Sequence, residues 1–130
     1  EERIHSDNRG RATISRFMLE QLEKGRQFET SADLLVQGIR LSDSVRIIAI
    51  EAEMVGELGN KILAAFSEGN TFTLGYSNGT GLYLPSARML PEGGYEVICH
   101  HEYGFASPLA PGIDDTLMKA VQRLRTEGSQ

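Results

Sequence analysis

The sequence predicts an α/β or α+β fold, in which a mixed sheet with a strand–helix–strand crossover is flanked by about three helices. β-branched residues dominate residues 45–53, as is typical of a strand, and apolar residues at helical spacing follow at 55–66. A second apolar strand is predicted at 71–76. Because such a unit almost always makes two parallel strands, both strands should end at one edge of the sheet.

The elements before this unit are predicted from the spacing of apolar residues. A helix is expected over residues 10–24, with Gly25 as its stop. Its apolar face comprises Ile14, Phe17, Met18 and Leu22. A strand over 34–41 follows, and the polar turn 42–44 joins it to the strand at 45–53, so these two strands should pair.

The elements after the unit begin with an ordered, glycine-punctuated loop over residues 77–95. A last strand is expected at 95–100. The final helix should start at Asp114 and Asp115, since acidic residues favour the first turn of a helix. Its apolar stripe comprises Leu117, Ala120, Val121 and Leu124.

Composition narrows the class of protein. The 130 residues carry a net charge of −5 and are 40% hydrophobic, which indicates one ordinary soluble globular domain or subdomain over 1–130. The acidic balance disfavours nucleic acid as a partner. One cysteine, Cys99, allows neither an internal disulfide nor a cysteine-based zinc site, and it is interpreted as a small core residue. No apolar run reaches the ~20 residues of a transmembrane segment.

The shared edge of the two parallel strands is the first candidate for a site. Ligands of open α/β sheets bind outside the carboxyl ends of the strands, and here those ends deliver Glu53 and the segment 76–78. Strand alternation places Glu51 on the same face as Glu53. The alternative is that both carboxylates point into solvent or pair with a cation such as Lys61.

The irregular stretch 75–96 is the second candidate. Ordered loops of this length are usually functional, and this one combines glycines, prolines and three tyrosines. The alternative is an Ω-like surface loop held by its own tyrosine rings. Asn78 also begins an Asn-Gly-Thr acceptor for glycosylation, which requires a eukaryotic secretory route.

Four segments together resemble the neutral/alkaline, non-lysosomal ceramidase family. They are IAIEAEMVGELGNKIL at 48–63, GYSNG at 75–79, LYLPSA at 82–87 and GGYE at 93–96. The resemblance covers about residues 34–100, which would make the chain the carboxyl-terminal part of the catalytic domain. The order and spacing of the four segments are more specific than any one of them.

The resemblance implies a zinc-dependent amidohydrolase that cleaves the N-acyl amide of ceramide-like lipids, in a secreted or periplasmic protein. It implies that Glu53 and Tyr83 are zinc ligands and that Tyr95, twelve positions after Tyr83, helps polarise the scissile carbonyl. A carboxylate and a phenolate are acceptable oxygen donors to zinc. Glu51 is the alternative to Glu53 as a ligand.

The family's histidine ligands have no counterpart in this chain. His5, His100 and His101 lie outside matching motifs, and on the predicted strand the last two would point to opposite faces, which favours a solvent-facing or partly packed pair over a metal site. The first residue, Glu1, is not methionine, and we therefore expect a fragment of a larger catalytic domain.

Two functions remain open from the sequence. In the first, the fragment is catalytically inactive alone, lacks zinc in isolation, and completes its site with the remainder of the parent domain. In the second, it is a non-catalytic packing or oligomerisation module, since a face that is uncovered by excision favours association into a homo-oligomer.

Overall fold

The computed structural model describes residues 9–127, and within them the side chains of residues 12–126. The elements run in the order α1 (Arg9–Glu23), β1 (Val36–Ser42), β2 (Val45–Ile50), β3 (Glu53–Met54), α2 (Gly56–Ala64), β4 (Asn70–Leu74), β5 (Tyr83–Leu84), α3 (Met89–Glu92), α4 (Tyr95–Ile98), a 3₁₀ segment (Cys99–Tyr103) and α5 (Ile113–Glu127).

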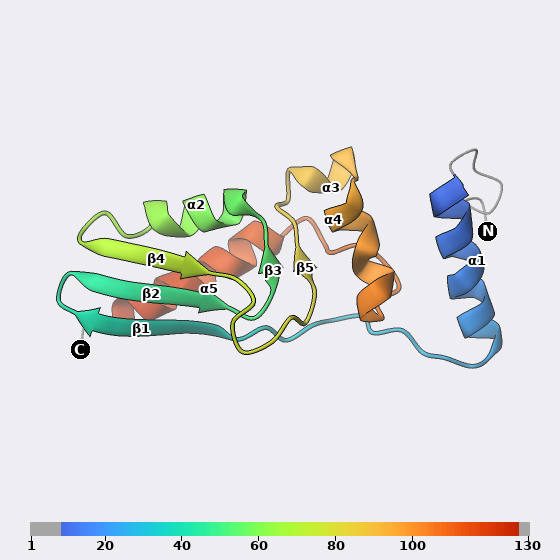
Figure 1. The fold of residues 1–130 in the computed structure, drawn as a ribbon, viewed down its shortest axis with the longest axis horizontal. Coiled ribbons are helices and arrows are strands. Elements are labelled where there is room, and N and C mark those ends of the chain that lie inside the picture. The colour runs from blue at the N-terminus through green and yellow to red at the C-terminus, as the bar shows by residue number, and fades with distance from the viewer. Residues whose placement is uncertain (1–8, 128–130) are drawn as a thin grey trace.

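A mixed three-stranded sheet forms one end of the molecule (Figure 1). Strand β2 lies in the middle, antiparallel to β1 and parallel to β4, and α2 connects the two parallel strands. The predicted fold class and the crossover are therefore confirmed. A second, two-stranded sheet pairs β3 with β5 in parallel.

Helices α2 and α5 cover one face of the three-stranded sheet, and the core lies between these helices and the sheet. Ile50, Leu58, Ile62 and Val121 are fully buried there. Leu124 of α5 packs over Gly38 of β1, where an added Cβ would lie at ordinary van der Waals distance, 3.5 Å. The apolar stripe predicted for the last helix is thus a packing surface.

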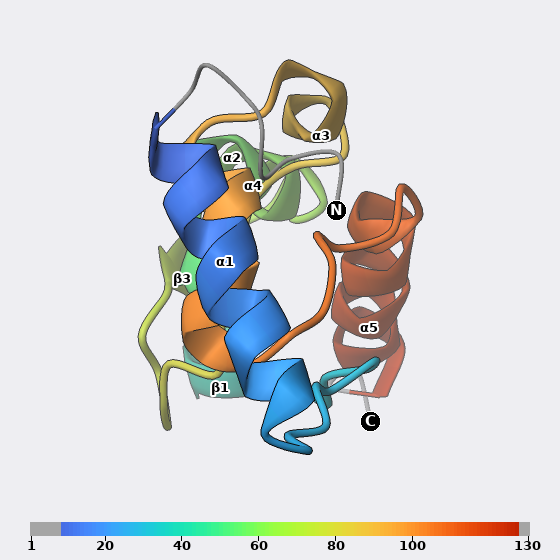
Figure 2. The same ribbon diagram turned by 90° about the vertical axis from the view of Figure 1, so that its right-hand side faces the viewer.

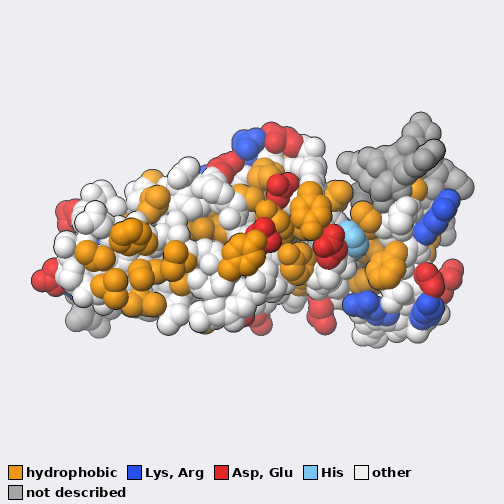
Figure 3. Space-filling view, viewed as in Figure 1, with side chains coloured by type: hydrophobic (Ala, Val, Ile, Leu, Met, Phe, Trp, Pro, Cys, Tyr) orange, Lys and Arg blue, Asp and Glu red, His pale blue; other side chains and the backbone are white. Residues whose placement is uncertain are grey.

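The other face of the sheet is left open by the described residues. Ile39, Ile47 and Phe72 form one row of aligned strand partners across it, and Ala49 and Leu74 belong to the next row. Figure 3 shows this face as a patch of apolar side chains over the three strands. Phe72 is 56% exposed there, although β-strand residues with large apolar side chains are usually covered.

Helix α1 lies at the opposite end of the molecule, beside α4 (Figure 2). Its bounds agree with the predicted helix at 10–24, and Gly25 follows it with φ +79°. Phe17 and Leu22 of the predicted apolar face are nevertheless exposed. Of that predicted face, Ile14 and Met18 line the pocket that α1 shares with α3 and α4.

The long strand predicted at 45–53 is wrong in its second part. Strand β2 ends at Ile50, the chain bends, and Glu53 then belongs to β3 in the second sheet. The bend follows from a change of backbone partners: Glu51 N–H donates to Leu35 O at 3.0 Å, whereas Glu53 N–H donates to Leu82 O at 3.0 Å.

The strand predicted at 95–100 is also wrong, because these residues form α4 and the start of the 3₁₀ segment. Gly93 and Gly94 both have positive φ, and this turn places Gly94 O where the N–H groups of Val97 and Ile98 donate to it. The backbone is thus satisfied locally, and no neighbouring strand is needed.

Asp114 connects the start of α5 to helix α2 and to the loop that follows β5. One carboxylate oxygen accepts a hydrogen bond from Ala87 N–H at 2.7 Å, and the other forms an ion pair with Lys61 of α2. Burial alone would raise the pKa of Asp114, but these two partners outweigh it and lower that pKa. The predicted acidic start of the last helix is confirmed, and the carboxylate also fixes the loop that leads out of β5.

Candidate functional site

The parallel pairing of β3 with β5 brings Glu53 and Tyr83 side by side. The two residues are direct partners in this sheet, and Val55 N–H extends the pairing with a hydrogen bond to Leu84 O at 3.2 Å. Both side chains are half-buried. A carboxylate and a phenol separated by 30 positions in the chain are therefore neighbours on a short, hydrogen-bonded frame.

Tyr95 joins this pair through its ring. The rings of Tyr83 and Tyr95 meet edge to face, with their centroids 6.0 Å apart. The Tyr95 hydroxyl donates a hydrogen bond to the Glu102 carboxylate at 3.1 Å, which fixes the direction of its proton. The structure thus brings together all three residues that the family resemblance singles out: Glu53, Tyr83 and Tyr95.

Tyr76 is a fourth member of the site. It follows β4 with φ +52°, a left-handed backbone conformation that a bulky side chain rarely adopts. Its N–H donates to Ala52 O at 2.8 Å, which holds the residue beside the bend before Glu53. The sequence located Tyr76 at this edge but gave no sign that the Glu53 carboxylate would raise its pKa.

The carboxylates keep the nearby phenols protonated. The nearby Glu53 carboxylate is the main reason that the pKa of Tyr76 rises to about 12. Burial, followed by the nearby Glu53 carboxylate, raises the pKa of Tyr83 to about 12. Glu102 raises the pKa of Tyr95, and burial raises that of Tyr103. Among the described residues, no lysine or arginine forms an ion pair with Glu53.

We expect alkaline titration to reveal this arrangement. Followed by tyrosinate absorbance, the folded chain should remain largely un-ionised at about pH 10, where unfolded tyrosines are half-ionised. Since the folded pKa values are raised, their contribution to stability is complete below about pH 10 and is lost as the pH rises towards 12. Glu53→Gln should shift the ionisation of Tyr76 and Tyr83 to lower pH.

The matched control for this titration is Glu92→Gln, which removes an exposed carboxylate that pairs with Arg88 instead of a tyrosine. It should leave the titration curve unchanged. A wild-type curve centred near pH 10, or equal curves for wild type and Glu53→Gln, would contradict the geometry of the site.

Glu51 has a structural role that the sequence did not suggest. Its Oε2 accepts a hydrogen bond from Leu35 N–H at 3.1 Å, and a Cβ on Gly79 would lie 2.8 Å from its Oε1. The carboxylate therefore closes the loop after β4 against the segment before β1. The alternative prediction, that Lys61 pairs with Glu51 or Glu53, is wrong, because Lys61 pairs with Glu57 and Asp114.

The two histidines near the site serve the 3₁₀ segment. His100 Nδ1 lies 2.9 Å from Phe105 O, and His101 Nδ1 lies 2.8 Å from Ile98 O. Their rings are half-buried and 5.9 Å apart, so they form a partly packed pair, but on a helical turn instead of the predicted strand. Cys99 is buried, as expected of a core residue. His5 lies outside the described residues.

A complete metal centre is not assembled within residues 9–127, where no group of three His, Cys, Asp or Glu side chains could hold a metal ion. No helix in that range is long and apolar enough to cross a membrane. Glu102 and Tyr103 belong to the site but were not predicted, because the segment that carries them was interpreted as a strand followed by a loop.

Comparisons of the chain with protein-family models, curated proteins and solved structures find no match. A function is therefore inferred from the geometry of Glu53 and the tyrosines, together with the resemblance in the sequence.

Proposed function

We propose that this chain supplies the glutamate and tyrosine ligands of a zinc-dependent amidohydrolase that resembles neutral ceramidases and acts on the N-acyl amide of ceramide-like lipids. One observation carries the proposal: Glu53 and Tyr83 are direct partners across β3 and β5, and the Tyr95 ring packs against Tyr83. The histidine ligands are assigned to the remainder of a parent catalytic domain.

The donor set fits zinc. Glu53 is half-buried, lies near phenols and forms no ion pair with the described lysines and arginines, so a metal ion would compensate its charge. When bound, zinc would supply a Lewis acid and a water of lowered pKa. Tyr83 would ligate zinc as a phenolate and would release its proton on binding, so metal affinity would depend on pH.

Tyr95 is assigned to the substrate carbonyl. Its hydroxyl is protonated at neutral pH, as phenols ordinarily are, and its single proton would turn from the Glu102 carboxylate to a developing oxyanion when substrate binds. Tyr95 as a residue is 55% exposed, which leaves it accessible to a ligand.

Zinc titration of the 130-residue chain by calorimetry tests the proposal. Two oxygen ligands should give weak binding, on the order of 10⁻⁴ M, because open zinc sites normally use three protein ligands. Glu53→Gln should abolish the binding. Tyr83→Phe should weaken it and remove the proton release.

One control is Tyr103→Phe, which removes a hydroxyl that has no hydrogen bond to Glu53. The other is Glu92→Gln, which removes an exposed carboxylate that pairs with Arg88. Circular dichroism would verify folding of each variant. Zinc binding that survives in Glu53→Gln would overturn the assignment. Tight stoichiometric binding by the wild type would contradict the claim that the ligand set is incomplete.

A second candidate function, a packing module that associates with a second copy of itself, is favoured by the open face of the sheet. The face carries Ile39, Leu41, Phe72 and Leu74, all exposed and uncharged. Such a face is complementary to a copy of itself, since stacked sheets interdigitate apolar side chains without opposing like charges.

Sedimentation velocity measures this association. We expect the wild type to dimerise as its concentration rises and Phe72→Lys to remain monomeric, because a lysine would be desolvated between the stacked sheets. Leu22→Lys is the control, since Leu22 is equally exposed but lies on α1, outside the face. A wild type that stays monomeric at all concentrations would overturn this second candidate.

A further inference from the structure

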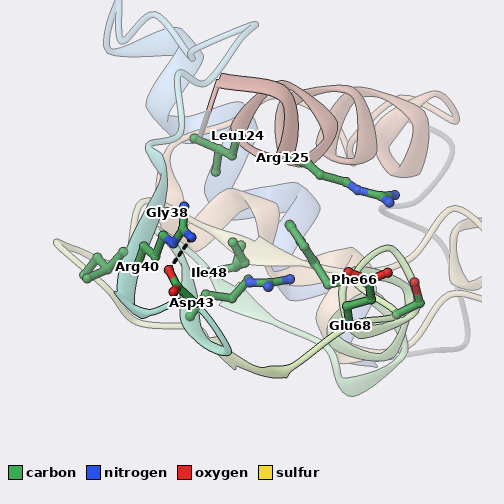
Figure 4. Close-up of a pocket in the computed structure, with 11 residues that line it drawn as sticks. Gly38, Arg40, Asp43, Ile48, Phe66, Glu68, Leu124 and Arg125 are labelled. Carbon is green, nitrogen blue, oxygen red and sulfur yellow. Dashed lines mark hydrogen bonds and ion pairs between the residues drawn. The ribbon is translucent and has the colours of Figure 1, made fainter. Parts of the chain in front are cut away.

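A cavity of about 390 Å³ lies at the edge of the sheet where β2 and β4 begin, opposite the edge that leads to Glu53. Its walls come from four separate parts of the chain. Figure 4 shows Arg40 on β1, Ile48 on β2, Phe66 after α2 and Arg125 on α5 around it. The candidate zinc site and this cavity share no lining residue.

The cavity combines an apolar base with guanidinium groups. Ile48 and Phe66 are buried, and Leu124 of α5 packs beside them. The guanidinium of Arg46 lies over the Phe66 ring, 5.1 Å from its centroid. This contact holds the positive charge over the ring face without using a hydrogen-bond acceptor, so it leaves the guanidinium N–H groups for another partner.

Arg46 is the best-placed donor in the cavity. Within the described part of the chain, no carboxylate forms an ion pair with it and no acceptor takes its hydrogens. Arg40, in contrast, pairs with Asp43 at 2.7 Å. Arg125 donates to Ala65 O at 3.1 Å and adds a second positive charge. With Asp43 neutralised, Glu68 is the remaining negative group of the lining.

We propose that this cavity binds a small organic carboxylate, with the carboxylate on Arg46 and Arg125 and an apolar tail on Phe66, Ile48 and Leu124. A guanidinium edge matches the two oxygens of a carboxylate in a paired arrangement. The cavity volume falls in the range of small-molecule sites, and an apolar base with few charged groups is typical of them. The proposal is independent of the zinc site.

The test is an NMR titration of the full chain with hexanoate, hexanol and inorganic phosphate. Hexanoate should bind with Kd on the order of 1 mM and shift the amide signals of Arg46, Phe66 and Arg125. Hexanol lacks the charge and phosphate lacks the tail, so each should bind at least about tenfold more weakly.

Arg46→Gln should weaken hexanoate binding by about tenfold or more. Arg46→Lys should weaken it by less, because lysine keeps the positive charge but lacks the paired N–H donors of the guanidinium. Arg123→Gln is the control: it alters an exposed arginine of α5 outside the cavity and should change nothing. If Arg46→Gln disturbs the fold, Arg125→Gln replaces it. Equal binding of hexanol or of phosphate, unchanged binding in the arginine variants, or no binding by the wild type would overturn the proposal.

Discussion

Gly69→Ala should lower the free energy of unfolding by roughly 3 kcal/mol or more, the range of severe single substitutions. Gly69 has φ +74°, which costs any other residue about 1 kcal/mol, and an added Cβ would lie 2.5 Å from Ser44 O. That carbonyl accepts a hydrogen bond from Asn70 N–H at 2.6 Å. The clash therefore separates the start of β4 from the turn between β1 and β2, where the parallel pairing begins.

Thermal unfolding measures this effect, and a fall in Tm of roughly 10 °C is expected. Substitutions at two other glycines separate the contribution of backbone strain from that of the steric clash. Gly25→Ala introduces the same backbone strain with no atom within 4 Å, and Gly56→Ala introduces neither strain nor contact. The expected order of destabilisation is Gly69, then Gly25, then Gly56. A Gly69 variant no less stable than the Gly25 variant would show that the predicted clash does not occur.

Ile62→Ala should destabilise the fold by about 2 to 5 kcal/mol, because it leaves a cavity in a fully buried position. Ile62 is 0% exposed, on the face of α2 that meets the sheet and α5. The substitution keeps the helix propensity high, so the loss reflects packing alone. Chemical denaturation gives the free energy directly.

Leu63→Ala is the matched control, since Leu63 is the next residue on the same helix and is 39% exposed. It should cost less than about 1 kcal/mol, because its side chain leaves a smaller cavity. Equal losses in the two variants would indicate that α2 is not packed against the core as described.

The elements that could be predicted from the sequence are those with a strong local pattern. Helices α1, α2 and α5 follow apolar spacing, and β1, β2 and β4 follow runs of β-branched and apolar residues. The parallel crossover then follows from chain order. The end of β2 was predicted wrongly: the sequence indicated a continuous strand to Glu53, but the strand ends at Ile50 and the chain bends.

The segment 95–103 could not be predicted because its pattern is ambiguous. Val97 and Cys99 are buried two positions apart, a spacing that favours a strand. The positive φ of Gly93 and Gly94 starts a helical turn instead, and this turn brings Tyr95 to Tyr83 and Glu102 to Tyr95. Half of the candidate site therefore depends on backbone geometry at two glycines.

The sequence by itself determined the fold class, the crossover and the edge of the sheet near which Glu53 lies, because helical and strand periods depend on residues close together in the chain. Only the tertiary structure decided that Glu53 leaves the main sheet, pairs with Tyr83 and meets Tyr76. Those contacts depend on backbone hydrogen bonds between segments about 30 residues apart, such as that from Glu53 N–H to Leu82 O, and no local pattern specifies such partners.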